Sequence, residues 1–324
     1  MRILYLTDDR SDYRGGTYYV DWMEAIGEGH DIICWGPGLP APSRQERRGT
    51  DLLIAGHSVI DVLVEGGYPF RPASWWRGAP ALPFWGRAVR RFPGPKVYLS
   101  KNDYKYIPGK RVFAENEGID LIVTHSQSAL QPFRQGGVAA EWLPFGVRRG
   151  RFRDLGLDRD IDIGFRGNLH TQETGDLRAR FVDAVRASCA DLRLDLVPSE
   201  QMEGFLAGEA YVQWLSRCRL VLTTVSAAQT VGTRFWEILA CGAVPLAPVD
   251  AYEGLLEPDV HYLAVRPDFA DLRGRVDRFL GDEALRTRLR SQGQAIAREA
   301  GLDRLAGRFW AALRAHGLID AGET

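Results

Sequence analysis

Residues 229–248, QTVGTRFWEILACGAVPLAP, combine a helix and a strand within a short stretch of sequence. Gly232 and Thr233 precede a run with apolar residues at helical spacing, and Thr233 is predicted to cap that helix. Gly242 follows the run at the position where a glycine commonly ends a helix, and the apolar residues 243–247 then predict a strand. A helix that leads through a glycine turn into a short apolar strand is a repeating unit of parallel α/β folds.

The same alternation of strands and helices extends in both directions along the chain of 324 residues. Apolar runs predict strands at 2–7, 30–35, 51–55, 96–99 and 120–124, and again at 161–165, 192–197, 219–224 and 243–247. Helices are predicted after Gly15 and Gly16, near 176–188, 208–217 and 233–241, and from about residue 270 onward. The Pro- and Trp-rich residues 68–95 are expected to form an irregular excursion from the first sheet.

An arginine-dense segment, 148–160, separates the two series of strands and helices. We therefore expect an α/β fold of two Rossmann-like, doubly wound domains that face each other across a cleft. The first domain is expected over residues 1–147 and the second over 148–324. The terminal helix is expected to pack either within the second domain or back on the first.

Composition and charge argue against several classes of protein. The 41 Lys and Arg residues balance 42 Asp and Glu residues, so nucleic acid is an unfavoured partner. The N-terminal apolar run is too short for a signal peptide, no stretch reaches the ~18 apolar residues of a membrane span, and we expect a cytoplasmic protein. Peripheral membrane contact through the arginine-rich C-terminal helices is less favoured than a solvated face, because acidic residues are interspersed. The four cysteines have no metal-ligand spacing and are expected to be reduced, buried thiols.

Arg234 and Glu237 lie three residues apart, on one face of the helix that Gly232 precedes. Backbone N–H groups and a cation at the start of a helix can bind a diphosphate. A carboxylate one turn further along can accept hydrogen bonds from both hydroxyls of a ribose. The spacing alone equally fits an Arg–Glu pair on the surface of an ordinary helix.

The stretch 229–248 resembles the nucleotide-sugar signature of group-1 GT-B glycosyltransferases, which act with retention of configuration. In that signature, a Glu, seven residues and a second Glu precede an Ala-x-Gly-x-Pro-like sequence. The resemblance implies that Glu237 binds the donor ribose and that the backbone of Gly232 faces the donor phosphates. Gln229 stands where the first Glu is usual, and its amide can pair with sugar hydroxyls but supplies no charge.

Together with 143–147 (LPFGV) and 162–168 (DIGFRGN), this stretch resembles the CgeB-like glycosyltransferases over most of residues 96–300. The resemblance implies that the second domain holds the nucleotide sugar, with Arg234 facing the diphosphate. It also implies an assisting basic residue after the first strand of that domain. Arg166 and Arg178 are the candidates, because Asn168 stands where the group-1 arginine is expected. The predicted donor-binding residues are thus Glu237, Arg234, Gly232, Thr233, Gln229, Arg166, Asn168 and Arg178, with Gly15 and Gly16 in the first domain.

Candidate catalytic residues follow the strands of the first domain, because ligands of open α/β sheets bind beyond the carboxyl ends of the strands. If the reaction inverts configuration, Asp9, His57, Asp103 and His125 are the candidates for its general base. If it retains configuration, the β-phosphate of the donor can take the acceptor proton. Both histidines also fit purely structural roles. Trp75, Trp76 and Trp85 could stack on the acceptor or equally pack beneath loops.

The predicted function is transfer of a sugar from a nucleotide-sugar donor to an unidentified acceptor, without a metal and without any other cofactor. An Asp-x-Asp metal site is disfavoured, because the run from Asp158 through Asp160 to Asp162 leads into a strand instead of leaving one. A dinucleotide-dependent dehydrogenase is disfavoured, because residues 7–16 lack Gly-x-Gly-x-x-Gly spacing. A nucleotide-sugar epimerase or hydrolase and a non-catalytic nucleotide-sugar-binding protein remain as alternatives.

Overall fold

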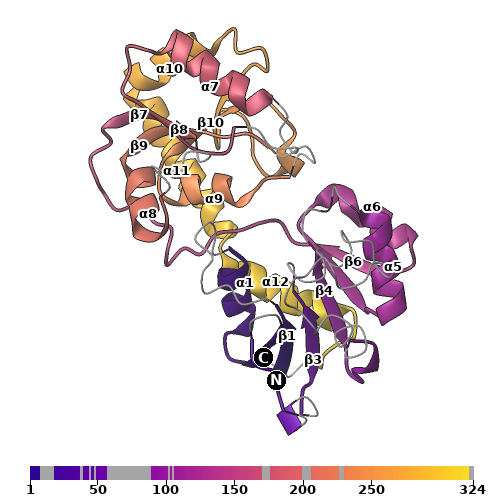
Figure 1. Cartoon of the computed structure of the whole chain (residues 1–324). Coiled ribbons are helices and arrows are strands. Elements are labelled where there is room, and N and C mark those ends of the chain that lie inside the picture. The colour runs from indigo at the N-terminus through magenta and orange to yellow at the C-terminus, as the bar shows by residue number, and fades with distance from the viewer. Residues whose placement is uncertain are drawn as a thin grey trace. The chain divides into compact units, whose positions relative to one another are not determined.

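The computed structural model describes residues 1–7, 18–36, 39–43, 45–46, 49–56, 89–100, 103, 106–169, 176–198, 206–225 and 230–320. The chain divides into two compact units. The first comprises Met1–Pro144 and Leu305–Thr324, and the second comprises Phe145–Arg304. Each unit contains its own parallel β-sheet with helices packed against it (Figure 1).

The sheet of the first unit has six parallel strands in the order β2-β1-β3-β4-β5-β6. These strands are β1 (Arg2–Leu6), β2 (Asp31–Trp35), β3 (Leu52–Ala55), β4 (Lys96–Ser100), β5 (Leu121–Thr124) and β6 (Ala139–Trp142). Strand β3 is apolar along its length, β5 is apolar up to Thr124, and both are entirely buried, as expected for a parallel sheet that is covered on both faces.

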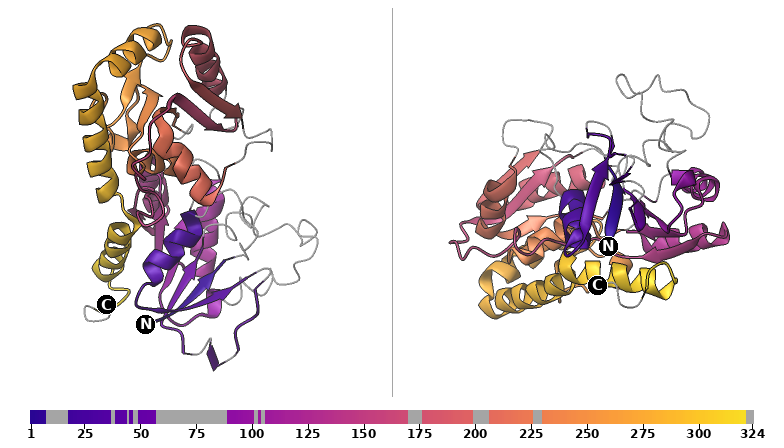
Figure 2. Two further views of the ribbon diagram at one scale, coloured as in Figure 1. Left: turned by 90° about the vertical axis from the view of Figure 1, so that its left-hand side faces the viewer. Right: turned by 90° about the horizontal axis from the view of Figure 1, so that it is seen from below.

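Among the described residues, the helices that accompany this sheet include α1 (Tyr18–Gly27), α5 (Ile107–Glu117), α6 (Leu130–Gln135) and α12 (Leu302–Ala315). Phe113 of α5 and Phe133 of α6 join the alternate strand residues Leu4 and Leu53 in one buried cluster. Helices α1 and α12 lie side by side in the views of Figure 2, with the ring centroids of Trp22 and Phe309 6.2 Å apart. The last part of α12, from Leu305, thus belongs to the first unit.

The sheet of the second unit has five parallel strands in the order β11-β10-β9-β7-β8. Its strands are β7 (Ile161–Gly167), β8 (Leu194–Pro198), β9 (Cys218–Leu222), β10 (Val244–Pro248) and β11 (Leu263–Val265). Its helices are α7 (Leu177–Ser188), α8 (Gly208–Arg217), α9 (Thr233–Ala240), α10 (Leu272–Gly281) and α11 (Glu283–Glu299).

Alternate residues of β9 show how both faces of this sheet are filled. Leu220 and Leu222 pack in one cluster with Phe181 of α7 and Val276 of α10. Val221, between them, packs in another cluster with residues of α8 and α9. The sheet therefore lies between α7 and α10 on one face and α8 and α9 on the other, which is the doubly wound arrangement predicted from the sequence (Figure 1).

The sequence prediction was incomplete for the short elements. Strands β6 and β11 were not predicted, because AAEW is of mixed polarity and LAV is only three residues long. Helices α5 and α6 were also missed. Strand β7 extends two residues beyond the predicted 161–165, to Gly167, so Arg166 lies within the strand and not after it.

Candidate functional site

The carboxyl edge of the second sheet opens between β7 and β9, where the order of the strands reverses. Strand β8, the next strand in the chain, pairs with one side of β7, and β9 pairs with the other side. The connections that leave the two neighbours run to opposite sides, and ligands of open α/β sheets bind at such a switch point. Gly167 ends β7 and Thr224 follows β9, so both lie at this edge.

Helix α9 begins in the connection between β9 and β10. Gly232 is the N-cap, with φ −70° and ψ 169°, and no side chain caps the helix. The prediction that Thr233 is the N-cap was therefore wrong: Thr233 is the first helical residue. Gly242 ends the segment as predicted, with φ +71°, a left-handed conformation that suits glycine. A Cβ added at Gly232 would meet no described atom within 4 Å, so the backbone beside the helix start is open.

Arg234, in the first turn of α9, extends to the end of β7. A Cβ placed on Gly167 would lie 2.5 Å from Nη1 of Arg234 and 2.8 Å from its Nη2. The guanidinium therefore rests against the backbone of Gly167, in space that only a glycine leaves open. This contact places a cation at the switch point, beside the N-terminus of a helix.

Arg178, near the start of α7, spans the same edge. Its Nη1 donates to the carbonyl oxygen of Asn168 at 2.8 Å, and its Nε donates to Oγ1 of Thr224 at 3.3 Å. It thus connects the residue after β7 with a residue after β9. Two of the predicted donor-binding arginines, Arg234 and Arg178, therefore lie at the carboxyl edges of the same two strands.

Arg166, the other candidate, has a different environment. Its Nη2 forms an ion pair with Oδ2 of Asp195 at 2.5 Å, and its guanidinium carbon lies 5.4 Å from the ring centroid of Trp214. Trp214 Nε1 donates to the same carboxylate oxygen at 2.9 Å. These contacts hold Arg166 against β8 and α8, so Arg178 is the better placed of the two for an anion at the switch point.

Tyr211 of α8 contacts the carboxylate of Glu237. Tyr211 was not among the site residues predicted from the sequence. The Tyr211 hydroxyl donates to Oε2 of Glu237 at 3.4 Å. Burial, and then the negative charge of Glu237, raise the pKa of Tyr211, so its phenol stays protonated and remains a donor. No local pattern marks Tyr211, because it meets Glu237 only when α8 and α9 pack together.

A second residue missed from the sequence is Glu253, in the short 3₁₀ segment Tyr252–Gly254 after β10. One oxygen of Glu253 accepts a hydrogen bond from the backbone N–H of Val231 at 3.0 Å, next to the N-cap of α9. Tyr252, Glu253 and Gly254 all have positive φ, at 45°, 53° and 72°. Left-handed conformations of bulky residues are costly and concentrate at functional sites.

The three aspartates of the disfavoured metal motif lie at the opposite, amino edge of the sheet. Asp160 pairs with Arg217 at 2.5 Å. Asp162 pairs with Arg219 at 2.6 Å and with Arg193 at 3.2 Å. Within the described part of the chain, no group of three or more His, Cys, Asp or Glu side chains could hold a metal ion.

In the first unit, Asp103 lies in a buried polar network at the carboxyl ends of β4 and β5. Its carboxylate pairs with Lys110 Nζ at 2.8 Å, with both side chains only 1% exposed. The hydroxyls of Ser100 and Thr124 donate to its two oxygens. A carboxylate with three donors in a buried network suits a structural role better than that of a general base.

His125, which follows β5, is only 2% exposed. Its Nδ1–H donates to the carbonyl oxygen of Leu143 at 2.7 Å, which leaves the Nε2 lone pair as the acceptor site. The ring packs edge-on against Tyr18 and Trp22 of α1, with centroids 5.6 and 6.0 Å away. Burial lowers the pKa of His125 to about 4, so the imidazole is neutral at pH 7.

Several predicted site residues lie outside the described residues: Asp9, Gly15, Gly16, His57, Trp75, Trp76, Trp85 and Gln229. Their predicted roles remain predictions. Of the four cysteines, Cys189, Cys218 and Cys241 are buried, Cys34 is partly buried, and all four are free thiols. No helix among the described residues has the length and apolar character needed to cross a membrane.

Comparisons with known proteins agree with this fold. Residues 178–306 match a family described as glycosyl transferase-like. HepE of Anabaena, crystallised with UDP, is 16% identical with a TM-score of 0.62, over 97% of this chain and 100% of HepE. Sucrose-phosphate synthase from Thermosynechococcus elongatus is 15% identical with a TM-score of 0.57, over 97% and 99% of the two chains. The DNA-modifying β-glucosyltransferase is 12% identical with a TM-score of 0.59, over 98% and 100%. A search of curated proteins finds no match.

The two doubly wound units and their likeness to these structures define a GT-B fold, as predicted. Residues 178–306 are similar to the glycosyl transferase-like family. The matched segment includes α9 and Arg178, which form part of the switch-point site, whereas Gly167 and Asn168 precede it. The narrower resemblance to the CgeB-like enzymes stays a prediction.

We expect Gly167→Ala to displace the guanidinium of Arg234, because the added Cβ would lie 2.5 Å from its Nη1, and to strain the backbone, because Gly167 has φ +155°. The melting temperature should fall, and affinity for a nucleoside diphosphate should fall about tenfold, or ~1.4 kcal/mol. Calorimetric titration measures this affinity. Gly29→Ala, where φ is +79° and a Cβ meets nothing within 4 Å, is the control for backbone strain alone. An unchanged affinity in Gly167→Ala would contradict the assignment of Arg234.

Removing the negative charge of Asp103 should be strongly destabilising, because Lys110 would remain buried without its counterion. We expect Asp103→Asn to lower the free energy of unfolding by about 3–5 kcal/mol, measured by urea denaturation. The double variant Asp103→Asn with Lys110→Met should recover a large part of that loss. A loss below about 1 kcal/mol in the single variant would show that the pair contributes little.

The low pKa of His125 predicts a loss of stability in acid. Below its ordinary pKa of 6.5 the unfolded chain binds a proton at this imidazole, whereas the folded protein does so only near pH 4. The free energy of unfolding should therefore fall by up to about 3 kcal/mol as the pH decreases through this window. His30 and His261 change in the same direction, so the measurement is the difference between wild type and His125→Asn. Parallel pH profiles for the two proteins would refute the prediction.

Proposed function

We propose that the protein transfers a sugar from a nucleoside-diphosphate sugar to an acceptor, and that the second unit binds the donor at its β7–β9 switch point. The observation that carries this proposal is the position of Arg234, whose guanidinium rests on Gly167 beside the N-terminus of α9. A cation and a helix N-terminus at the switch point of a doubly wound sheet form a site for a diphosphate.

The charges of this site match those of the donor. Arg234 and Arg178 supply two positive charges at the carboxyl edges of β7 and β9. The first N–H groups of α9 have no acceptor within the helix, and the open backbone at Gly232 lets an anion approach them. These groups can stabilise the negative charge that develops on the departing diphosphate. We therefore propose a transfer that proceeds without a metal ion or other cofactor.

Glu237 is proposed to bind the donor ribose. It lies one turn beyond Arg234 on the same face of α9. The hydroxyl of Tyr211 donates to its Oε2 and so orients the carboxylate. A carboxylate has two oxygens with about four lone-pair sites, and hydroxyl groups such as those of a ribose can donate to them.

UDP-glucose is the first donor to test. HepE has been crystallised with UDP, with UDP-glucose, and with UDP and glucose. These complexes support a uridine donor for this chain through likeness of fold. The acceptor is proposed to enter over the first unit, where Trp75, Trp76 and Trp85 are the predicted acceptor-binding residues.

The group-1 resemblance supports retention of configuration. In that course the glycosidic bond to the β-phosphate breaks, the acceptor oxygen bonds to the anomeric carbon on the same face, and the β-phosphate takes the acceptor proton. An inverting course would need a base from the first unit, for which Asp9, His57 and His125 are candidates. NMR of the first-formed product distinguishes the two outcomes by its anomeric configuration.

Arg234→Gln should weaken UDP binding about 10- to 100-fold, because a hydrogen bond to a charged group contributes about 1.5–3 kcal/mol. Glu237→Gln should weaken UDP binding about tenfold, since the ribose loses a charged acceptor. Isothermal titration calorimetry with UDP measures both. The control is Arg288→Gln, which removes an exposed arginine of α11. Wild-type affinity in Arg234→Gln would rule out the proposed donor site.

Donor turnover separates the transferase from its alternatives. With UDP-glucose and a panel of acceptors, a transferase consumes the donor faster when its acceptor is present. An epimerase or hydrolase consumes or isomerises the donor equally in its absence. A binding protein takes up UDP-glucose and leaves it intact, and this result would refute the proposed transfer.

A further inference from the structure

A second charged cavity lies in the same unit, at the amino edge of its sheet. Its volume is about 370 Å³, and its wall includes Asp158, Arg159, Arg219, Glu283, Arg286 and Arg290. Arg159 precedes β7 and Arg219 is the second residue of β9, so the cavity opens beside the amino ends of these strands. In a parallel sheet this edge is opposite the carboxyl edge that forms the proposed donor site. A cavity of this size is suited to a small molecule.

Arginines outnumber carboxylates in the lining of the cavity, and Asp154 and Asp162 pair with three of them from behind the wall. Four arginines face two carboxylates, those of Asp158 and Glu283, in its lining. A guanidinium has five N–H donors. Nη1 of Arg219 donates to the carboxylate of Asp162. Nη1 of Arg286 donates to two carbonyl oxygens at the end of α10. Donors therefore remain on both side chains for a ligand that carries negative charge.

The first two turns of α11 present their charged face to the cavity. Glu283, Arg286, Thr287 and Arg290 follow one another at helical spacing and all line it. Thr287 is exposed and lies between the guanidinium-bearing residues of this face.

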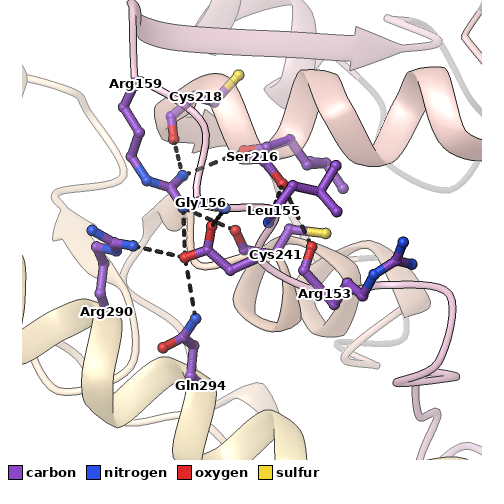
Figure 3. Close-up of polar contacts among 11 residues, drawn as sticks. Arg153, Leu155, Gly156, Arg159, Ser216, Cys218, Cys241, Arg290 and Gln294 are labelled. Atoms are coloured by element: carbon purple, nitrogen blue, oxygen red, sulfur yellow. Dashed lines mark hydrogen bonds and ion pairs between the residues drawn. The ribbon is translucent and has the colours of Figure 1, made fainter.

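Arg159 and Arg290 are brought together around one carboxylate just outside the lining. Asp154 pairs with Arg159 at 3.1 Å and with Arg290 at 2.7 Å, and Gln294 donates to it at 3.4 Å (Figure 3). Burial, and then the neighbouring charge of Arg290, lower the pKa of Arg159. The two guanidinium groups repel each other although they share the Asp154 carboxylate, and a bound anion would offset that repulsion.

Arg159 also connects this cavity to the helices of the donor site. Its Nη1 donates to the carbonyl of Cys218 at 2.5 Å and its Nη2 to that of Cys241 at 2.9 Å, as Figure 3 shows. These carbonyls end α8 and α9, which carry Tyr211 and Glu237. A Cβ added at Gly242 would lie 2.8 Å from Arg159 Nη2, so the end of α9 is packed tightly against this side chain.

We propose that this cavity is an effector site for a small anion with two or more negative charges, of the diphosphate or phosphate-ester class. Four arginines supply the recognition, and a shift of Arg159 on binding changes the packing of α8 and α9. The binding of the anion is independent of the proposed function, whereas its effect on the donor site rests on that function. A coupling of this kind acts in both directions between the two ligands.

Binding is tested with pyrophosphate in the Arg234→Gln background, which weakens the donor site. The matched variants are Thr287→Glu, which adds a negative charge to the cavity wall, and Thr287→Gln, which adds the same bulk without charge. Calorimetric titration should show pyrophosphate affinity within about twofold of the background protein in Thr287→Gln and at least tenfold lower in Thr287→Glu. Equal affinities in the two variants, or no pyrophosphate binding in the background protein, would overturn the proposal.

Coupling is tested by UDP titration of Thr287→Gln and Thr287→Glu, each with and without pyrophosphate and with Arg234 intact. Competition at the donor site affects both variants alike, so the coupling is the difference between them. In each variant, pyrophosphate changes the apparent UDP affinity by some factor. We expect this factor to differ at least threefold between the two variants. Equal changes would overturn the coupling. If UDP binds to neither variant, the proposed function fails, while the pyrophosphate titration still decides the cavity.

Discussion

The parallel pairing of β7 with both β8 and β9 is the constraint on which the second unit depends. Ile163 pairs with Leu194 on one side and with Leu220 on the other. This register places the carboxyl ends of β7 and β9 together and leaves the edge between their diverging connections open. Gly167 ends β7 without a side chain, and the guanidinium of Arg234 occupies the space so left. The diphosphate site proposed here is a consequence of that register.

The same register also gathers charge at the other edge of the sheet. Residues that precede β7 and begin β9 lie together there, and they include Arg159 and Arg219. Helix α11 adds further arginines to this edge. The two ends of one sheet thus carry separate cationic sites, and α8 and α9 run between them. Arg159 contacts the ends of these helices, whereas Glu237 and Tyr211 lie within them.

In the described part of the first unit, Asp103 and His125 at the carboxyl edge of the sheet are buried. Asp103 neutralises Lys110 in a buried network, and His125 packs its ring against α1. Both residues follow strands at positions where catalytic groups are often found, which is why the sequence indicated them. The three donors to the Asp103 carboxylate favour a structural role for this residue, because they already occupy much of its accepting capacity.

The sequence by itself determined the doubly wound fold of both halves and the helix that starts at Thr233, because both depend on apolar periodicity and glycine turns within a few residues. It also indicated Arg234, Glu237 and Arg178. Only the tertiary structure decided that Arg166 pairs with Asp195, that Tyr211 meets Glu237, and that four arginines share one cavity. These contacts join residues far apart in the chain, and their geometry depends on strand register and helix packing, which no local pattern encodes.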